Sequence, residues 1–124
     1  MKSADVKRHR RITRLQAVSL GVSDFERAVT FYQDVLGLEV KVVAPGHYAT
    51  IPQVNISLVS SGEVVASQGF HVELVVDDVD TWYQHLGNHG ATFLSKPKDQ
   101  PWGARNFYML DPEGHKLELT TAMP

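Results

Sequence analysis

The chain has 124 residues, of which 43% are hydrophobic and 21% charged, and its formal net charge is −2. This length suits one domain with a sizeable core, and the small charge gives no reason to expect a nucleic-acid partner. The absence of cysteine excludes disulfides, thiolate metal sites and cysteine nucleophiles, which leaves His, Asp and Glu as strong metal ligands. No apolar run approaches the roughly 20 residues that span a bilayer, so we expect a cytoplasmic protein with no membrane partner.

The chain begins with a basic segment. Residues 1–14 hold six Lys or Arg against one acidic residue, a charge of +5, so the remaining residues carry −7. We expect residues 1–13 to form a solvated arm, with contact to a partner subunit or an anionic surface as the alternative. No nucleic-acid recognition motif or aromatic platform accompanies this arm.

A strand followed by a helix then occurs twice. Residues 17–24 (AVSLGVSD) and 71–78 (HVELVVDD) match at an offset of 54 in three apolar positions of one strand face and in a final Asp. The spacing of Ser23 and Glu26 predicts a capping box at the first helix, which ends near Gly37. The second helix begins at Asp77 or Asp78 and ends at Gly87 or Gly90.

Three further extended segments follow each helix. They are residues 39–43, 48–51 and 54–59 in the first half, and 91–95, 106–110 and 116–120 in the second. The order β-α-β-β-β, twice, predicts an α+β fold with two tandem modules, about residues 14–62 and 68–121. We expect these modules to form curved mixed sheets around an open cleft, within a single domain of residues 14–121.

The segments VSLGVSDFERAVTFYQDVLGLEV, FHVELVVDDVD and FYMLDPEGHKLEL together resemble the vicinal oxygen chelate superfamily, which includes glyoxalase I, extradiol dioxygenases and fosfomycin- and bleomycin-resistance proteins. The resemblance covers nearly the whole chain, and the PWG sequence before a strand is similar to the bleomycin-resistance branch. It implies a small-molecule ligand and a homodimer, often with the modules of one chain completing the cleft of the other.

The same resemblance implies positions for metal ligands. The histidine of the second module falls on His71 and the carboxylate of the last strand on Glu118, whereas the position in the first module falls on Ala17, which cannot bind a metal. A fourth ligand position would fall in the strand of residues 54–59, where Asn55 and Ser57 are only weak donors. Gln16 lies next to Ala17 and would need a bulge to face the cleft, whereas His47, in a turn, could reach the cleft. We therefore expect either no cofactor or one divalent metal ion.

We expect six residues to line the cleft: His71, Glu73, Trp102, Arg105, Tyr108 and Glu118. Glu73 shares the strand face of His71, the indole of Trp102 would form a flat apolar wall, and Arg105 would bind an anionic group. The alternatives are a core or dimer contact for Trp102, a surface ion pair for Arg105 and an outward carboxylate for Glu118.

Two functions compete. The first is a protein that binds or sequesters an aromatic or amphipathic compound without a complete metal site, which the alanine at position 17 favours. The alternative is a divalent-metal-dependent lyase, isomerase or dioxygenase, which the retained His71 and Glu118 favour. A dimer that serves a regulatory partner without ligand chemistry is a third interpretation.

Overall fold

The computed structural model describes residues 10–64 and 69–124. The elements of the first half are β1 (Val18–Val22), α2 (Phe25–Thr30) with a π-helical continuation (Phe31–Val35), β2 (Lys41–Ala44), β3 (Tyr48–Ile51), a 3-10 turn (Pro52–Val54) and β4 (Ile56–Ser60). These strands form a sheet in the order β1-β4-β3-β2, in which β1 runs parallel to β4 and the other pairs are antiparallel.

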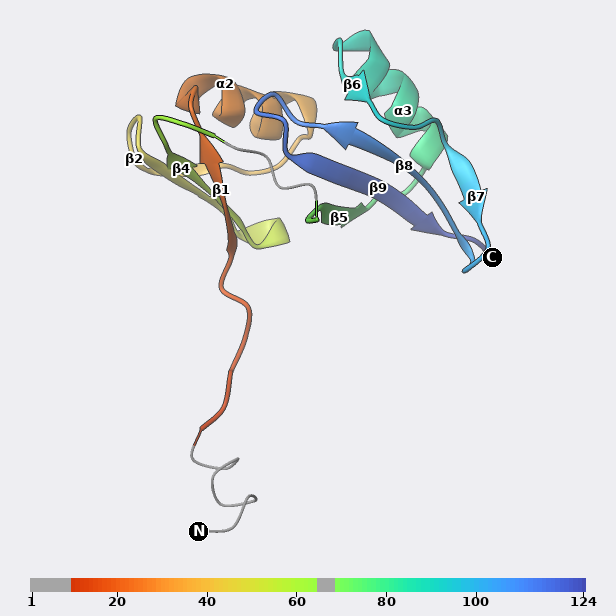
Figure 1. Ribbon diagram of the computed structural model, residues 1–124, viewed down its shortest axis with the longest axis horizontal. Helices are drawn as coiled ribbons and strands as arrows, with labels where there is room; N and C mark the ends of the chain where they lie inside the picture. The colour runs from red at the N-terminus through yellow and green to blue at the C-terminus, as the bar shows by residue number, and fades with distance from the viewer. Residues whose placement is uncertain (1–9, 65–68) are drawn as a thin grey trace.

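The second half repeats this plan. Its elements are β5 (Val72–Val75), α3 (Val79–Asn88), β6 (Thr92–Phe93), β7 (Lys98–Gln100), β8 (Ala104–Leu110) and β9 (Lys116–Ala122). The sheet order is β5-β9-β8-β6, β5 is parallel to β9, and β7 also pairs with β8. Figure 1 shows the two mixed sheets, each with its helix over one face. The predicted α+β class with a repeated unit is confirmed.

Local differences from the sequence prediction have physical causes. The cap of α2 is Asp24 rather than Ser23, because the Asp24 carboxylate accepts the backbone N–H of Arg27 at 3.1 Å. The strand expected from residue 54 begins at Ile56, after a tight turn in which Asn55 has a φ of 56°. The unpredicted β7 follows Pro97, which has no N–H to donate to a strand ladder.

The core lies between each sheet and its own helix. In the first half Leu20, Val22 and Leu58 are at most 3% exposed beneath Ala28 and Tyr32 of the helical segment. Burial of each large apolar side chain contributes roughly 1.5–3 kcal/mol. In β1, β3, β4, β8 and β9, alternate residues therefore face the core, and the residues between them face the uncovered side of the sheet.

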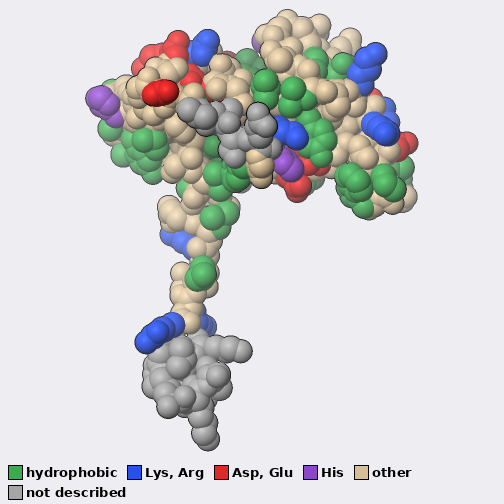
Figure 2. Space-filling model, viewed as in Figure 1, with side chains coloured by type: hydrophobic (Ala, Val, Ile, Leu, Met, Phe, Trp, Pro, Cys, Tyr) green, Lys and Arg blue, Asp and Glu red, His purple; other side chains and the backbone are tan. Residues whose placement is uncertain are grey.

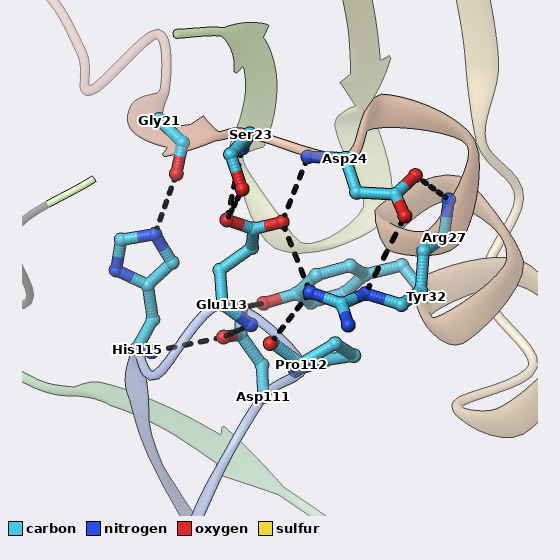
Figure 3. Close-up of polar contacts among 9 residues, drawn as sticks. All are labelled: Gly21, Ser23, Asp24, Arg27, Tyr32, Asp111, Pro112, Glu113 and His115. Carbon is cyan, nitrogen blue, oxygen red and sulfur yellow. Dashed lines mark hydrogen bonds and ion pairs between the residues drawn. The ribbon is translucent and has the colours of Figure 1, made fainter. Parts of the chain in front are cut away.

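A buried carboxylate joins the two halves (Figure 3). Glu113 lies in the turn between β8 and β9, and its side chain is 3% exposed. It accepts hydrogen bonds from the backbone N–H of Ser23 at 2.8 Å, the Ser23 hydroxyl at 2.9 Å and the backbone N–H of Asp24 at 3.0 Å. A carboxylate at the start of a helix satisfies free donors and interacts favourably with the helix dipole. The second half therefore stabilises the first turn of α2.

Two further contacts reinforce this junction. The hydroxyl of Tyr32 donates to Asp111 at 2.7 Å, and Nε2 of His115 donates to the carbonyl of Gly21 at 2.8 Å (Figure 3). Burial raises the pKa of Tyr32 well above its ordinary 10.0, and the charge of Asp111 adds to this effect. The phenol therefore stays protonated as a donor across the physiological pH range.

The described part of the N-terminal segment stands clear of the body (Figures 1 and 2). Residues 10–16 are exposed and contain no strand or helix, and Ile12 is 97% exposed. The predicted arm of residues 1–13 otherwise lies outside the described residues. Among the described helices, none has the length and apolar character needed to cross a membrane.

We expect Glu113→Gln to lower the free energy of unfolding by about 2 kcal/mol at pH 7, because charge-assisted hydrogen bonds are lost. Burial opposes ionisation of Glu113, but the hydrogen bonds from Ser23, Asp24 and Arg27 outweigh it, so its pKa lies below the ordinary 4.5. A group with a lowered folded pKa stabilises the fold above its unfolded pKa and loses this contribution as the pH falls through its folded value. Urea denaturation should therefore show the difference between variant and wild type shrinking below about pH 4.5.

Glu26→Gln is the matched control, because it removes an exposed acid from the first turn of the same helix. Its effect should be about 0.5 kcal/mol. Equal destabilisation by the two substitutions would contradict a special role for the buried carboxylate.

Candidate functional site

A polar group lies on the uncovered face of the second sheet. Glu73 of β5 and Tyr108 of β8 are both register partners of Glu118 on β9, so these three side chains share a face. His71 immediately precedes β5. One potential ligand atom from each of His71, Glu73 and Glu118 lies within 4.8 Å of the others. The structure thus brings together four of the six residues expected in the cleft.

Glu118 is the buried carboxylate of this group. Its side chain is 6% exposed, and Nε2 of His71 donates to Oε1 at 3.0 Å. The side-chain amide of Asn106 donates to Oε2 of Glu118 at 3.0 Å. The side-chain amide of Gln100 donates in turn to Oδ1 of Asn106 at 3.0 Å. Sequence reasoning missed Asn106, although it lies two residues before Tyr108 and therefore on the same strand face. This chain of amides fixes the orientation of the buried carboxylate.

The donor set suits a divalent cation. Glu73 is 65% exposed, and its Oε1 lies 3.4 Å from Nε2 of His71. Two ionised carboxylates with a neutral imidazole carry a charge of −2, and nitrogen and oxygen donors of this kind bind zinc, manganese or iron. In the described part of the chain, neither carboxylate pairs with Lys or Arg. The residues present therefore fit a metal ion.

Tyr108 borders the group. Its ring lies edge-on to that of His71 at 5.6 Å between centroids, and Nζ of Lys116 lies 4.4 Å from the centre of the tyrosine ring. Burial raises the pKa of Tyr108 above 10.0, and the charge of Glu118 raises it further. At neutral pH the phenol is consequently a hydrogen-bond donor beside the carboxylates.

The structure does not bring Arg105 and Trp102 to this group. Arg105 lies on the opposite face of β8, where it donates to both carboxylate oxygens of Asp80 at 2.9 and 3.0 Å and to Asp99 at 2.9 Å. These contacts lower the pKa of Asp80. The reason is strand alternation, since an odd-numbered residue of β8 cannot share a face with Asn106 and Tyr108. Trp102 lies in the turn between β7 and β8 and is 67% exposed.

Among residues 10–64, which the structure describes in the first half, no strong metal ligand lies near Ala17. Ala17 lines a hollow of about 490 Å³, together with Gln16, whose side chain accepts from Arg14 at 2.7 Å. Asn55 lies in the turn before β4, and His47 is exposed in the turn between β2 and β3. The hydroxyl of Ser57 is hydrogen-bonded to Ser19 at 2.6 Å.

Two mixed sheets, with a histidine and carboxylates on the uncovered face of one, define the class of glyoxalase-like proteins. A sequence model of the Glyoxalase/Bleomycin resistance protein/Dioxygenase superfamily matches residues 14–119, and the chain belongs to this superfamily. The resemblance seen in the sequence is thereby confirmed.

Similar proteins with curated descriptions include two transferases. The chain is 33% identical over 113 residues to the glutathione transferase FosA of Serratia marcescens, covering 85% of this chain and 78% of the relative. It is 28% identical over 118 residues to the metallothiol transferase FosB of Staphylococcus epidermidis, covering 89% and 82%. It is 30% identical over 123 residues to the uncharacterised protein YraH of Bacillus subtilis, covering 86% and 96%.

Solved structures support the fold. A protein of unknown function from Agrobacterium tumefaciens has a TM-score of 0.78 at 22% identity, with 94% of this chain and all of that chain covered. The fosfomycin resistance protein FosX of Listeria monocytogenes has a TM-score of 0.76 at 17% identity, covering 91% and 96%. At identities this low, the similarity shows a shared fold and does not indicate a shared function.

The influence of Glu118 on Tyr108 gives a spectroscopic prediction. We expect Glu118→Gln to lower the pKa of Tyr108 towards 10, because the substitution removes a negative charge that disfavours the phenolate. The phenolate absorbance should be followed during an alkaline titration, with Tyr108→Phe used to identify the contribution of this tyrosine. An unchanged pKa in Glu118→Gln would show that burial alone raises it.

Proposed function

We propose that this chain is a divalent-metal-dependent enzyme that modifies a small molecule, with His71, Glu73 and Glu118 as its metal ligands. The observation that carries the proposal is the convergence of these three ligand atoms around a buried carboxylate held by Asn106. An acidic pair with one imidazole has the charge and the donor types that such an ion requires.

The relatives support an enzyme over a protein that only binds. FosA and FosB are named as transferases, and the name of FosB includes a metal and a thiol. We infer that this chain acts as a thiol transferase. The chain has no cysteine, so the thiol would come from a second substrate.

Each side chain of the group has a definable task. A divalent ion held by the group would supply Lewis-acid chemistry, the polarisation of substrate oxygens. His71 and Glu118 would hold the ion, while Asn106 keeps Glu118 in one orientation. Tyr108 retains its proton at neutral pH and would donate a hydrogen bond to a substrate oxygen. Lys116 above its ring adds positive charge that favours an anionic group.

Glu73 takes on a specific importance in this proposal. Catalytic metal sites normally use three protein ligands, and Ala17 removes the one expected from the first half. Glu73, which follows His71 by two residues on the same strand face, would supply the third ligand. We further propose a homodimer in which the uncovered faces of the sheets form a shared cleft for the substrate.

A second candidate function is binding of a small molecule without a metal. The specific observation in its favour is Ala17 itself, beside a hollow whose polar lining includes Gln16 and Arg14. The two functions differ in whether the protein binds a metal ion.

Metal titration tests the proposal. Protein freed of metal by a chelator should bind Mn²⁺ or Zn²⁺ in calorimetry with a stoichiometry of one per chain. His71→Ala and Glu118→Gln should each abolish saturable binding, and Glu73→Gln should weaken it at least tenfold if the carboxylate is a true ligand. His47→Ala is the control, because it removes an exposed histidine outside the group. Wild-type protein that binds neither ion would favour the metal-free function.

The role of Asn106 gives an independent prediction. We expect Asn106→Ala to weaken metal binding by about tenfold or more, because the partner that orients Glu118 is lost. Asn88→Ala at the exposed end of α3 should leave the affinity unchanged. Equal affinity in Asn106→Ala and wild type would remove Asn106 from the support of the metal.

A further inference from the structure

The hydrogen bonds behind Glu118 all run in one direction. Nε2 of Gln100 donates to Oδ1 of Asn106 at 3.0 Å, and Nδ2 of Asn106 donates to Oε2 of Glu118 at 3.0 Å. Each amide therefore turns its N–H groups towards the buried carboxylate and its oxygen away from it. We call Gln100, Asn106 and Glu118 the amide relay.

The orientation of the Asn106 amide matters because this side chain is buried. Asn106 is 1% exposed, so solvent has little access to either end of its amide. An asparagine presents donors at Nδ2 and an acceptor at Oδ1, and half a turn of the amide exchanges the two. After such a turn, Oδ1 would lie against the acceptor Oε2 of Glu118, and Nδ2 would lie against the donor of Gln100. Only the observed orientation satisfies both contacts.

The relay assigns the two oxygens of Glu118 to different partners. Oε2 accepts from Asn106, whereas Oε1 lies 3.0 Å from Nε2 of His71. A carboxylate whose oxygens are both hydrogen-bonded cannot rotate about its terminal bond without breaking both contacts. The relay therefore determines which oxygen of Glu118 lies beside the imidazole of the proposed metal group.

Gln100 reaches the relay from the short strand β7. In the described part of the chain, β7 has one strand neighbour, β8, and the register pairs Asp99 with Arg105 and Gln100 with Ala104. Because side chains alternate along a strand, Gln100 lies on the face of Asn106 and Asp99 lies on the opposite face. A strand with a single neighbour needs other contacts to keep its place.

An ion-pair cluster on the opposite face provides those contacts. Arg105 donates to Asp99 of β7 at 2.9 Å and to both carboxylate oxygens of Asp80 on α3 at 2.9 and 3.0 Å. The planar guanidinium suits such paired contacts and here joins β7, β8 and α3. Arg105 therefore holds the strand that carries Gln100, although it lies on the other face from the metal group.

We propose that Gln100 is a positioning residue of the metal group. Its side chain determines which end of the Asn106 amide faces Glu118, and Arg105 keeps β7 where Gln100 can reach Asn106. Gln100 acts through Asn106 and not as a ligand. The inference rests on the proposed function in treating Glu118 as a metal ligand, and it extends the support of that ligand to a separate strand.

Two substitutions at position 100 separate the relay from simple electrostatics. Gln100→Met keeps the length of the side chain and removes the donor, so the affinity of the full chain for Mn²⁺ in calorimetry should fall roughly threefold to tenfold. Gln100→Glu adds a negative charge, which by Coulomb attraction alone would tighten cation binding. In the relay, however, it places an acceptor opposite Oδ1 of Asn106, so the affinity should fall at least as far as in Gln100→Met.

Matched controls and a double substitution show whether Gln100 acts through Asn106. Gln84→Met and Gln84→Glu make the same changes at an exposed position of α3 and should bind Mn²⁺ as the wild type does. In the Asn106→Ala background, Gln100→Met should cause no further loss of affinity. Circular dichroism and thermal unfolding show whether each variant keeps its fold. Additive losses from the two substitutions, or tighter binding by Gln100→Glu, would overturn the inference.

The side-chain amide signals of Asn106 test the relay without a metal. In isotope-labelled, chelator-treated protein observed by NMR, this pair of signals is identified by its loss in Asn106→Ala. Gln100→Met should shift the pair and speed its exchange with water, whereas Gln84→Met should leave it unchanged. Unchanged Asn106 signals in folded Gln100→Met would overturn the inference. Shifted signals in a protein that binds no metal would contradict the proposed function and still support the relay as the device that orients Glu118.

Discussion

The placement of every functional side chain depends on one constraint: each sheet is covered by a helix on only one face. Alternate residues of a strand must then enter the core, which forces the residues between them onto the uncovered face. In β9 this separates Leu117 and Leu119, both buried in the core, from Glu118. The parallel pairing of β5 with β9, the first and last strands of the second half, then places Glu73 opposite Glu118. A shift of one residue in this register would move the carboxylates into the core.

Burial of the Glu118 carboxylate has an energetic consequence. A buried ionised group is costly unless it is paired and hydrogen-bonded, and here the partners are one imidazole and one amide. Glu113 is also buried, but three donors around the start of α2 satisfy it. The two buried glutamates therefore differ in how their negative charge is compensated. Glu113 is compensated within the chain and stabilises the junction, whereas Glu118 beside Glu73 keeps an excess of negative charge, which a cation would balance.

Strand alternation made much of the fold and part of the site predictable. The repeat at an offset of 54 and the turn residues located both halves, and His71, Glu73, Tyr108 and Glu118 followed from periodicity together with the family resemblance. Arg105 lies elsewhere, because it is three residues from Tyr108 on β8 and strand alternation turns it to the opposite face. The predicted strand began only at residue 106, so this constraint was not applied to Arg105, and the short β7 beside it was not evident. Asn106 and Glu113 were missed for a different reason: their roles arise from contacts with residues distant in the sequence.

The two halves share a register but have diverged in chemistry, and this divergence bears on the missing ligand. Because Ala17 and Ser19 correspond to His71 and Glu73 through the repeat, the first half lacks both strong donors at once. A single lost ligand would leave an unmatched acid in the first half, whereas here both positions carry side chains that are not strong metal ligands, an alanine and a serine. This favours the proposed metal centre as one supplied by the second half alone, in which Glu73 lies beside Glu118 and takes the place of the ligand that the first half does not provide.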